Sequence, residues 1–381
     1  MNKNPLIGLK EIGQSVWLDN LSRKLIHSGE LKRLIDEDGV SGITSNPTIF
    51  QKAISGSTDY DSSLRRMIDK GVKDEKELFL GLAMEDVSDA ADFLRPAYQS
   101  TNGRDGFVSI EVSPDLAYDT DATISEAKRL FSTLGKKNIL VKVPGTKQGV
   151  PAIEELTSEG VNINVTLLFS TDRYEEVAEA YLKGLERRVS QGQPIQEIAS
   201  VASFFVSRVD TLTDKLLQAR LSSATSKAGK DKIAGLFGKA AVANAKIAYK
   251  KYKSVFSGKR FLALKAKGGR IQTILWGSTG TKNPNYSDIK YVEELVAPDS
   301  INTLPEATIK AFKEHGQAKV TIADGLKEAE KLFPELKPMG IDIREVTDQL
   351  EKEGVQLFSD SFFALLKEIA KKRDSFLMQP H

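Results

Sequence analysis

Short runs of β-forming residues recur along the chain, and between them apolar residues repeat at the three- and four-residue spacing of amphipathic helices. One such helical stripe runs from Ile124 through Leu130 to Leu134. Strands that alternate with helices are typical of parallel sheets, and eight repeats close a (β/α)8 TIM barrel. The sequence therefore predicts an α/β fold of this kind, with strands at residues 16–19, 43–46, 107–112, 139–143, 161–169, 200–206, 270–276 and 301–304.

Two connections between the predicted strands are too long to be simple loops. Residues 48–106 and 207–269 both contain apolar positions at helical spacing, which predicts helical insertions. After the eighth strand, residues 338–381 form a C-terminal helical extension in which apolar residues such as Phe362 share one face. We expect that face to pack on the barrel mouth or on the outer ring of helices, with a second subunit as the alternative. The whole chain, residues 1–381, is predicted to form a single barrel domain.

Polar residues fall on one side of several predicted strands. Neighbouring side chains of a strand point to opposite faces, so residues two apart share a face. In the fifth strand this puts Asn164 and Thr166 on one face, with the apolar Ile163 and Val165 on the other. Because helices cover the apolar face, the polar face points into the barrel, near the C-terminal strand ends where barrel enzymes place their chemistry. The same rule gives an inward polar set from six strands, made up of Asp19, Asn46, Ser109, Glu111, Lys142, Asn164, Thr166 and Ser203.

Lys142 is the most informative member of this polar set, since it lies within the apolar run 139–144. Lysine is rarely buried without a partner, and removing its ammonium group from water favours the neutral, nucleophilic amine. Lys142 is therefore a candidate for forming a Schiff base with a carbonyl substrate. The alternative is a lysine at the barrel rim whose methylene stem lets the ammonium group reach water.

The polar set points to one kind of chemistry. Each member has a simpler explanation on its own, such as helix capping by Asp19 or Asn46. Burying a lysine, two carboxylates and several amides together without a charged ligand would be costly, however. An amine nucleophile, two carboxylates for proton transfer and amides suited to hydroxyl groups describe reversible cleavage of a carbon–carbon bond in a polyhydroxy ketone.

Composition narrows the chemistry further. The chain has no cysteine and only three scattered histidines, so disulfides and thiolate chemistry are excluded and no metal site is expected. No apolar run is long enough to span a membrane, and the N-terminus lacks the apolar core of a signal peptide. We therefore expect a cytoplasmic protein that contacts no membrane.

The small net charge of +2 conceals a basic segment. Residues 226–270 contain eleven lysines and two arginines against one aspartate. Such a segment can attract nucleic acid or a phosphorylated metabolite. Tyr249, Tyr252 and Phe256 fall at helical spacing within it, however, so we favour an amphipathic helix with a solvated lysine face and expect no nucleic-acid partner.

The residues that carry this chemistry resemble those of the transaldolase family, and the resemblance extends over nearly the whole chain. The chain length and the Gly-Ser-Thr-Gly-Thr-Lys-Asn-Pro stretch look most like the longer bacterial and plant-type branch. The resemblance implies a class I aldolase-like barrel without metal or organic cofactor. The motifs that carry it lie at residues 16–19, 42–47, 109–112, 141–144, 162–169, 203–208 and 276–284.

The reaction implied by the resemblance moves a dihydroxyacetone unit between sugar phosphates in the non-oxidative pentose phosphate pathway. The donor is sedoheptulose 7-phosphate or fructose 6-phosphate, and the acceptor is glyceraldehyde 3-phosphate or erythrose 4-phosphate. Lys142 would attack the donor's C2 ketone, while Glu111 and a water held by Thr166 move the protons of Schiff-base formation. Asp19 would take the C4 hydroxyl proton as the C3–C4 bond breaks. The hydroxyl groups of the bound three-carbon unit would be held by Asn46 and Asn164.

The resemblance also implies a site for the substrate phosphate. Ser203 and Arg208 match the family's anion site, and Phe205 lies between them as a further substrate-binding position. An arginine can bind phosphate through two parallel hydrogen bonds. For a second cation we favour Lys282, with Arg270 at the other end of the seventh strand as the weaker candidate.

Two other interpretations stay open at this point. A fructose 6-phosphate aldolase-like lyase would use the same lysine, aspartate and asparagine, but such relatives are shorter and carry Gln and Tyr in place of Glu111 and Phe205. The other is a non-catalytic protein that binds sugar phosphates, or RNA through residues 226–270, with the steep salt dependence of nucleic-acid binding. For the oligomeric state we expect a monomer or a homodimer.

Overall fold

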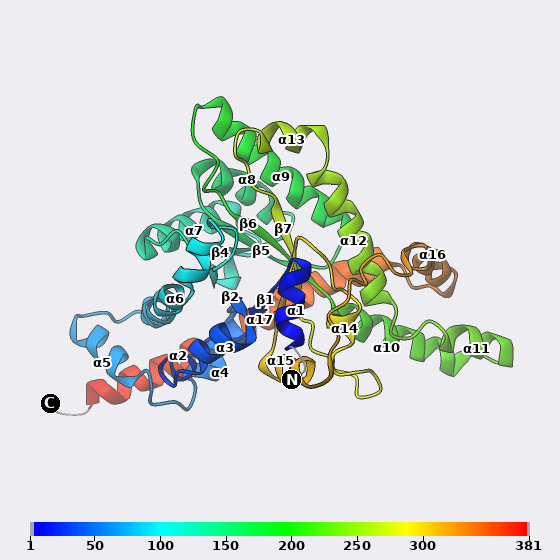
Figure 1. Cartoon of the computed structure of the whole chain (residues 1–381). Helices are drawn as coiled ribbons and strands as arrows, with labels where there is room; N and C mark the ends of the chain where they lie inside the picture. Colours follow the sequence, from blue (N-terminus) through cyan, green and yellow to red (C-terminus); the bar gives the residue numbers. More distant parts are fainter. Residues whose placement is uncertain (1–3, 379–381) are drawn as a thin grey trace.

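A closed barrel of eight parallel strands forms the centre of the computed structural model, which describes residues 4–378 (Figure 1). The strands follow one another around the barrel in chain order, and β8 pairs with β1. This confirms the predicted (β/α)8 barrel. The two ends of the predicted domain, residues 1–3 and 379–381, lie outside the described residues. The strands are β1 (Gln14–Leu18), β2 (Val40–Ile43), β3 (Val108–Glu111), β4 (Ile139–Pro144), β5 (Ile163–Leu168), β6 (Ser200–Phe205), β7 (Gln272–Gly277) and β8 (Ser300–Leu304).

Helices surround the barrel and fill both long connections predicted from the sequence (Figure 1). The connection from β2 to β3 holds α4 (Pro47–Ile54), α5 (Asp61–Asp69) and α6 (Glu75–Ser100), and the one from β6 to β7 holds α10 (Ser207–Ser223), α11 (Lys227–Ala234), α12 (Ala240–Phe256) and α13 (Lys259–Lys265). The other helices are α1 (Pro5–Ile12), α2 (Arg23–His27), α3 (Glu30–Asp38), η1 (Pro114–Leu116), α7 (Thr120–Leu134), α8 (Gly149–Glu159), α9 (Thr171–Ser190), α14 (Lys290–Glu293), α15 (Glu306–His315), α16 (Leu326–Leu336), η2 (Lys337–Met339) and α17 (Ile343–Met378).

The interior of the barrel has an apolar lower part and a polar upper part. The lower part, near the N-terminal strand ends, is a plug of side chains that we call the apolar plug. Two residues further along β1, β4 and β6, the same face of each strand carries Asp19, Lys142 and Ser203. The polar set therefore rests directly on the apolar plug, which consists of Trp17, Phe107, Leu140, Ala199, Val201, Leu275 and Ile301.

Gly42 on β2 makes room for the largest side chain of the apolar plug. A Cβ atom at Gly42 would lie 2.3 Å from the indole ring of Trp17, which is fully buried. Because no real Cβ comes so close to another heavy atom, only glycine at position 42 lets the ring fill the barrel next to β2.

The basic segment, residues 226–270, folds as the three helices α11, α12 and α13, and α12 is the amphipathic helix expected from the sequence. Tyr252 and Phe256 of α12 are buried, and Tyr249 packs partly against the core. The lysines on its outer face form ion pairs, including Lys250 with Glu330. Charges that are already paired within the protein attract a nucleic-acid backbone less strongly.

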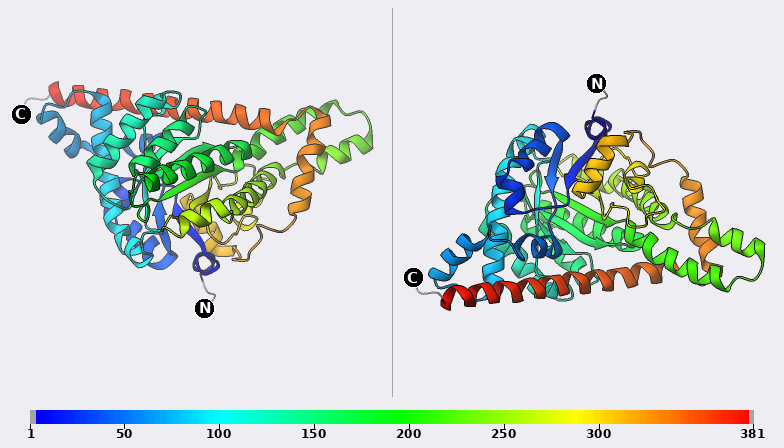
Figure 2. Two further views of the ribbon diagram at one scale, coloured as in Figure 1. Left: turned by 90° about the horizontal axis from the view of Figure 1, so that it is seen from above. Right: turned by 90° about the horizontal axis from the view of Figure 1, so that it is seen from below.

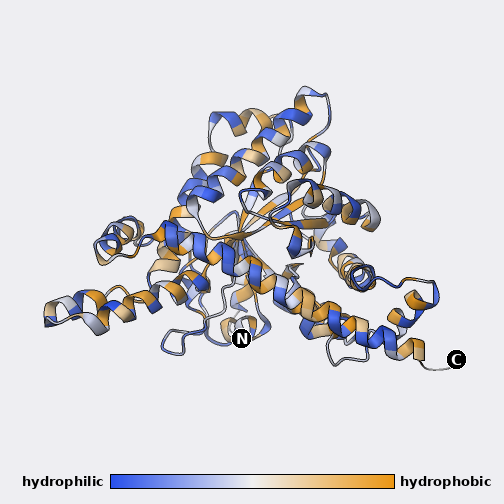
Figure 3. Ribbon diagram, turned by 180° about the vertical axis from the view of Figure 1, so that it is seen from behind, coloured by the Kyte–Doolittle hydropathy of each residue, from blue (hydrophilic) through white to orange (hydrophobic). Residues whose placement is uncertain are grey.

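The C-terminal helix α17 crosses one face of the molecule and contacts α4, α6, α10 and β5, which places it over the C-terminal strand ends (Figures 2 and 3). Phe362 packs edge-on against Phe79 of α6, with ring centroids 5.6 Å apart. Gly354 lets the helix come close to β5, since a Cβ there would lie 2.9 Å from Leu167. The helix thus packs on the barrel mouth, which is one of the locations expected from the sequence. Between residues 4 and 378 no helix combines the length and apolar character needed to cross a bilayer.

Candidate active site

Lys142 and Glu111 form a buried pair at the mouth of the barrel. They occupy matched positions of the neighbouring strands β4 and β3, and Lys142 Nζ lies 3.2 Å from Glu111 Oε2. The ammonium group also donates a hydrogen bond of 2.9 Å to the backbone carbonyl of Ser45, just beyond β2. Lys142 is 4% exposed and Glu111 8% exposed, so Lys142 is not a rim lysine that extends into water.

Burial raises the pKa of the Glu111 carboxyl group, although the nearby charge of Lys142 lowers it in part. A carboxyl group with a raised pKa accepts and releases protons closer to neutral pH than an ordinary glutamate does. Apart from its ion pair with Lys142, Glu111 Oε2 has no hydrogen-bond partner among the described residues, so it can exchange a proton with the lysine or with a molecule bound beside it. The pair thus combines a buried amine with a carboxyl group suited to proton transfer.

Asp19 follows β1 and lies on the same inner surface. Its carboxylate accepts a hydrogen bond of 2.8 Å from Thr44, whose hydroxyl group is also 2.7 Å from that of Thr303. Desolvation raises the pKa of Asp19, and the charge of Lys142 opposes the effect. A second carboxyl group with a raised pKa therefore lies within electrostatic reach of the lysine.

Strand β5 contributes an amide and a hydroxyl group to the same region. Asn164 donates to Ser109 Oγ at 2.9 Å and accepts from Ser203 Oγ at 2.7 Å, so both ends of its amide are fixed. The buried hydroxyl group of Thr166 has no hydrogen-bond partner among the described residues. An unpaired buried hydroxyl group is costly, and a bound water or substrate would satisfy it. Next to it, Leu167 has a φ of 58°, a strained value for leucine.

Asn46 both caps a helix and faces the candidate site. Its side-chain oxygen accepts a hydrogen bond from the backbone N–H of Ile49, which makes it the N-cap of α4. A small cavity lined by Asn46, Glu111 and Phe362 of α17, among others, lies beside it. The capping expected as the simpler explanation is thus present, yet the amide nitrogen is still available to donate to a ligand.

Three cations meet at the edge of the barrel mouth. Arg208, in the first turn of α10, lies 5.7 Å from the ring centroid of Phe205. Desolvation lowers the pKa of Lys282, and the positive charges of Arg208 and Lys52 lower it further, so the three are close enough to repel one another. None of them has a carboxylate within 4.0 Å in the part of the chain that the structure describes. Such a cluster suits a phosphate group.

Arg270 lies away from the three cations, and Ser203 lies on the inner face of the barrel. The guanidinium group of Arg270 binds the backbone carbonyls of Asn102 and Gly103 in a pocket at the N-terminal strand ends, so it does not meet Lys142 or Arg208. The reason is its position before β7 begins, at the opposite end of the barrel. Ser203 lies inside the barrel and donates its hydroxyl proton to Asn164. Of the two candidates for the second cation, Lys282 is the one that lies near Arg208.

Three contacts were not predicted from the sequence. Thr44 faces Asp19, the carbonyl of Ser45 accepts from Lys142, and Lys52 joins the cation cluster. Strand alternation could have identified Thr44, which lies two residues before Asn46. Nothing in the local sequence distinguishes Lys52 from other surface lysines.

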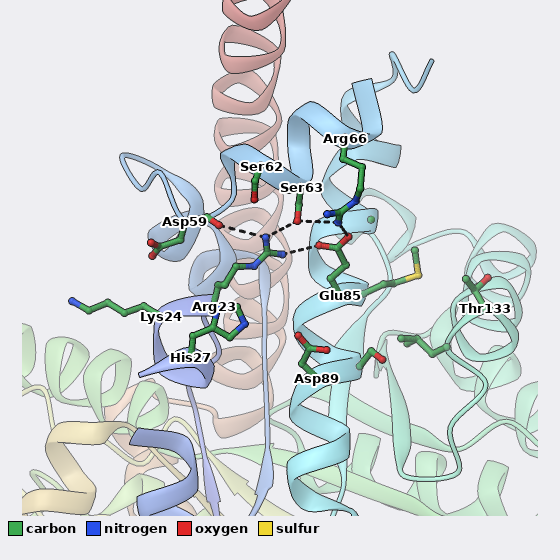
Figure 4. Close-up of a pocket in the computed structure, with 14 residues that line it drawn as sticks. Arg23, Lys24, His27, Asp59, Ser62, Ser63, Arg66, Glu85, Asp89 and Thr133 are labelled. Atoms are coloured by element: carbon green, nitrogen blue, oxygen red, sulfur yellow. Dashed lines mark hydrogen bonds and ion pairs between the residues drawn. The ribbon is translucent and has the colours of Figure 1, made fainter. Parts of the chain in front are cut away.

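A hollow of about 720 Å³ between α2, α5 and α6 also contains arginines, but it lies apart from the cation cluster at the barrel mouth (Figure 4). Arg23 pairs with Glu85 at 2.9 Å and with Asp86 at 3.0 Å, and Arg66 pairs with Glu85 as well. Its arginines are therefore neutralised by carboxylates within the protein, unlike the cations at the barrel mouth. No group of three or more potential metal ligands occurs among residues 4–378.

Comparison with known proteins shows what kind of protein carries this site. The family model described as "Transaldolase/Fructose-6-phosphate aldolase" matches residues 16–369. The chain belongs to this family. It is thus an enzyme of the transaldolase family, and the resemblance seen in the sequence is confirmed.

Relatives of this family match over almost their full length. A protein named "Transaldolase 2" from Nostoc sp. is 45% identical over 372 residues, which is 97% of each chain. A protein named "Transaldolase" from Trichodesmium erythraeum is 44% identical over 98% of each chain. Another from Saccharopolyspora erythraea is 45% identical over 97% of this chain and 98% of its own. The similarity to these transaldolase-family proteins thus extends over at least 97% of each chain.

Proposed function

We propose that the chain is a transaldolase that works through a Schiff base on Lys142. The observation that carries the proposal is the pairing of a buried lysine with Glu111, at 3.2 Å, in a mouth that also holds Asp19. A class I aldolase needs a neutral amine, a proton carrier beside it and a second carboxylate for the substrate hydroxyl. The inner face of the barrel brings together a lysine and two carboxyl groups that can fill these roles.

The first half of the reaction forms the covalent intermediate. The amine of Lys142 adds to the C2 ketone of the donor ketose phosphate, and Glu111 supplies the proton with which the carbinolamine oxygen leaves as water. The unpaired hydroxyl group of Thr166 holds a water that relays these protons. Asp19 then takes the proton of the C4 hydroxyl group, the C3–C4 bond breaks, and its electron pair moves into the iminium to give an enamine.

The second half transfers the three-carbon unit. The first aldose phosphate leaves, and the enamine carbon attacks the aldehyde of the acceptor while Asp19 returns its proton to the new hydroxyl group. Hydrolysis of the imine then releases the new ketose phosphate. Asn46 and Asn164 hold the hydroxyl groups of the dihydroxyacetone unit, and Ser109 and Ser203 fix the amide of Asn164.

Arg208 and Lys282 bind the substrate phosphate, next to Phe205. No carboxylate lies within 4.0 Å of either cation among the described residues, and a phosphate dianion would neutralise both. The family implies sugar-phosphate substrates. When the phosphate is bound by this cluster at the barrel mouth, the reacting carbons of the sugar can reach Lys142.

The transferase is favoured over a lyase. The family description covers both activities, but the relatives that match over the full length are named transaldolases. Glu111 and Phe205 also stand where the lyases resembled in sequence carry Gln and Tyr. A protein that only binds sugar phosphates would have no use for the buried lysine, and the ion-paired lysines of α12 speak against an RNA binder.

The test separates transfer from cleavage. Fructose 6-phosphate is mixed with the protein, with and without erythrose 4-phosphate, and release of glyceraldehyde 3-phosphate is followed by a coupled dehydrogenase assay. We expect turnover that depends on the acceptor. Equal turnover without acceptor would instead identify a lyase, and no turnover in either mixture would refute both. The single-domain organisation, the cytoplasmic location and the monomeric or homodimeric state of the enzyme stay predictions.

A further inference from the structure

A second pocket lies at the N-terminal end of the barrel, where the strands begin. Its volume is about 670 Å³, a size typical of small-molecule sites. The first residues of β1, β6, β7 and β8 and the loop before β3 surround it. No step of the proposed reaction uses this pocket, which is separated from Lys142 by the apolar plug.

The inner wall of the pocket is apolar. Phe107, Val201 and Ile301 line it, and all three belong to the apolar plug. Each of these side chains is at least 95% buried, so the part that reaches the pocket is the underside of a well-packed core. A surface of this kind suits an apolar, preferably flat, part of a ligand.

The rim of the pocket is cationic. Arg104, Lys265 and Arg270 line it, and none has a carboxylate within 4.0 Å among residues 4–378. Asp299 is the acidic side chain among the described lining residues, and it pairs with Lys253 at 3.0 Å. The lining therefore carries an uncompensated positive charge, in contrast to the hollow of Figure 4 with its paired arginines.

Arg270 is fixed at the rim by neutral groups. Its guanidinium group donates to the backbone carbonyls of Gly103 and Asn102, the latter at 3.1 Å. These two bonds use two of the five N–H donors of an arginine and leave its charge unneutralised. The side chain is therefore held in place with donors to spare, which lowers the entropic cost of binding an anion.

We propose that this pocket binds an organic anion, with a phosphate, sulfonate or carboxylate group at the cationic rim and a flat apolar body against the inner wall. The charge would be held by Arg104, Lys265 and Arg270, and the body by Phe107 and Ile301. The site is distinct from the catalytic mouth, so such a ligand binds together with the sugar phosphate.

A pair of fluorescent probes tests the proposal. Anilinonaphthalene sulfonate has a flat apolar body with one negative charge, and N-phenyl-1-naphthylamine has nearly the same body without the charge. The full chain is titrated with each probe in the presence of saturating fructose 6-phosphate. We expect saturable binding of the anionic probe at one site and binding of the neutral probe that is about tenfold weaker or more.

Two double variants assign the signal to the pocket. Arg104 and Lys265 are exposed, so replacing them leaves the core intact. In Arg104→Ala/Lys265→Ala the anionic probe should bind about tenfold more weakly or worse, whereas Arg104→Lys/Lys265→Arg keeps both charges and most of the affinity. Equal binding of the two probes, an unchanged affinity in the alanine variant, or displacement of the probe by fructose 6-phosphate would overturn the proposal.

Discussion

The amine of Lys142 and the carboxyl group of Glu111 face each other across one pair of neighbouring strands, 3.2 Å apart and shielded from solvent. The amine must lose a proton before it can attack a ketone, and Glu111 is an acceptor within reach whose pKa is raised by burial. Because β3 and β4 hold both residues in register, the pair is arranged before the substrate binds.

Borohydride trapping should label Lys142. Incubation with fructose 6-phosphate followed by sodium borohydride reduces the imine to a stable three-carbon adduct, which peptide mass spectrometry locates. In Lys142→Arg we expect no adduct and a loss of activity on the order of a thousandfold or more, because a guanidinium group forms no imine. Active wild-type protein that yields an unmodified Lys142 peptide would rule out the mechanism.

Replacing Asp19 by asparagine should make the protein more stable and inactive. The pKa of Asp19 is raised above its ordinary value of 3.8, so the folded state binds the proton more tightly than the unfolded state. The free energy of unfolding therefore falls as the pH rises from 3.8 through the raised pKa, and the ionised carboxylate costs stability at neutral pH. Asparagine stays neutral, so we expect a gain of about 0.5–2 kcal/mol at pH 8.

Urea unfolding at pH 8 and at pH 4 measures this gain, which should shrink at the lower pH. Asp231→Asn, at an exposed position of α11, is the matched control and should change the free energy of unfolding by less than about 0.5 kcal/mol at either pH. A less stable Asp19→Asn protein at pH 8 would show that the carboxylate is held favourably.

Lys52→Ala should weaken the binding of sugar phosphates without slowing the chemistry. Lys52 lies near Arg208 and Lys282 but is exposed, so its contribution is electrostatic and screened by salt. We expect KM to rise about two- to fivefold at low ionic strength, with kcat nearly unchanged and the difference reduced in 0.5 M salt. Lys319→Ala removes an exposed lysine elsewhere and serves as the control; if both variants behave alike, Lys52 has no specific role.

Gly42→Ala should destabilise the barrel. The new methyl group would lie 2.3 Å from the Trp17 ring, and the ring is enclosed by the apolar plug, so strands must shift to make room. We expect a loss of about 1–3 kcal/mol or more in the free energy of unfolding, measured with urea. At Gly280 an added Cβ would make ordinary contacts no shorter than 3.4 Å, so Gly280→Ala should change little. Equal effects of the two substitutions would contradict this account.

The alternation of side chains along the strands predicted much of the candidate site. To apply it, one needs to know only which face of each strand the helices cover. It brought Glu111, Lys142 and Asn164 to one inner surface, where the structure has them in contact or one strand apart. The same geometry explains why Arg270 lies away from this surface. It stands at the start of a strand, and a strand carries its first and last residues to opposite ends of the barrel.

Contacts made by the loops could not be predicted in this way. The carbonyl of Ser45 and the ammonium group of Lys52 reach the site from the segment after β2, whose path depends on the packing of α4 under α17. The C-terminal helix itself was recognisable from its apolar face, but only the folded barrel shows which surface it covers. Packing of this kind involves residues about 300 positions apart, such as Thr48 with Ser361.

The indole of Trp17 gives the reaction chamber a closed floor, and this has a consequence for the fate of the covalent intermediate. Water expelled as the imine forms, and water that later hydrolyses it, must both pass through the opening by which sugars enter and leave. While an aldose occupies that opening, solvent is kept from the bound three-carbon fragment. The acceptor sugar and water therefore compete for the intermediate at the barrel mouth. Because the other end of the barrel is closed, an acceptor bound in the mouth favours transfer of the three-carbon unit over its hydrolysis.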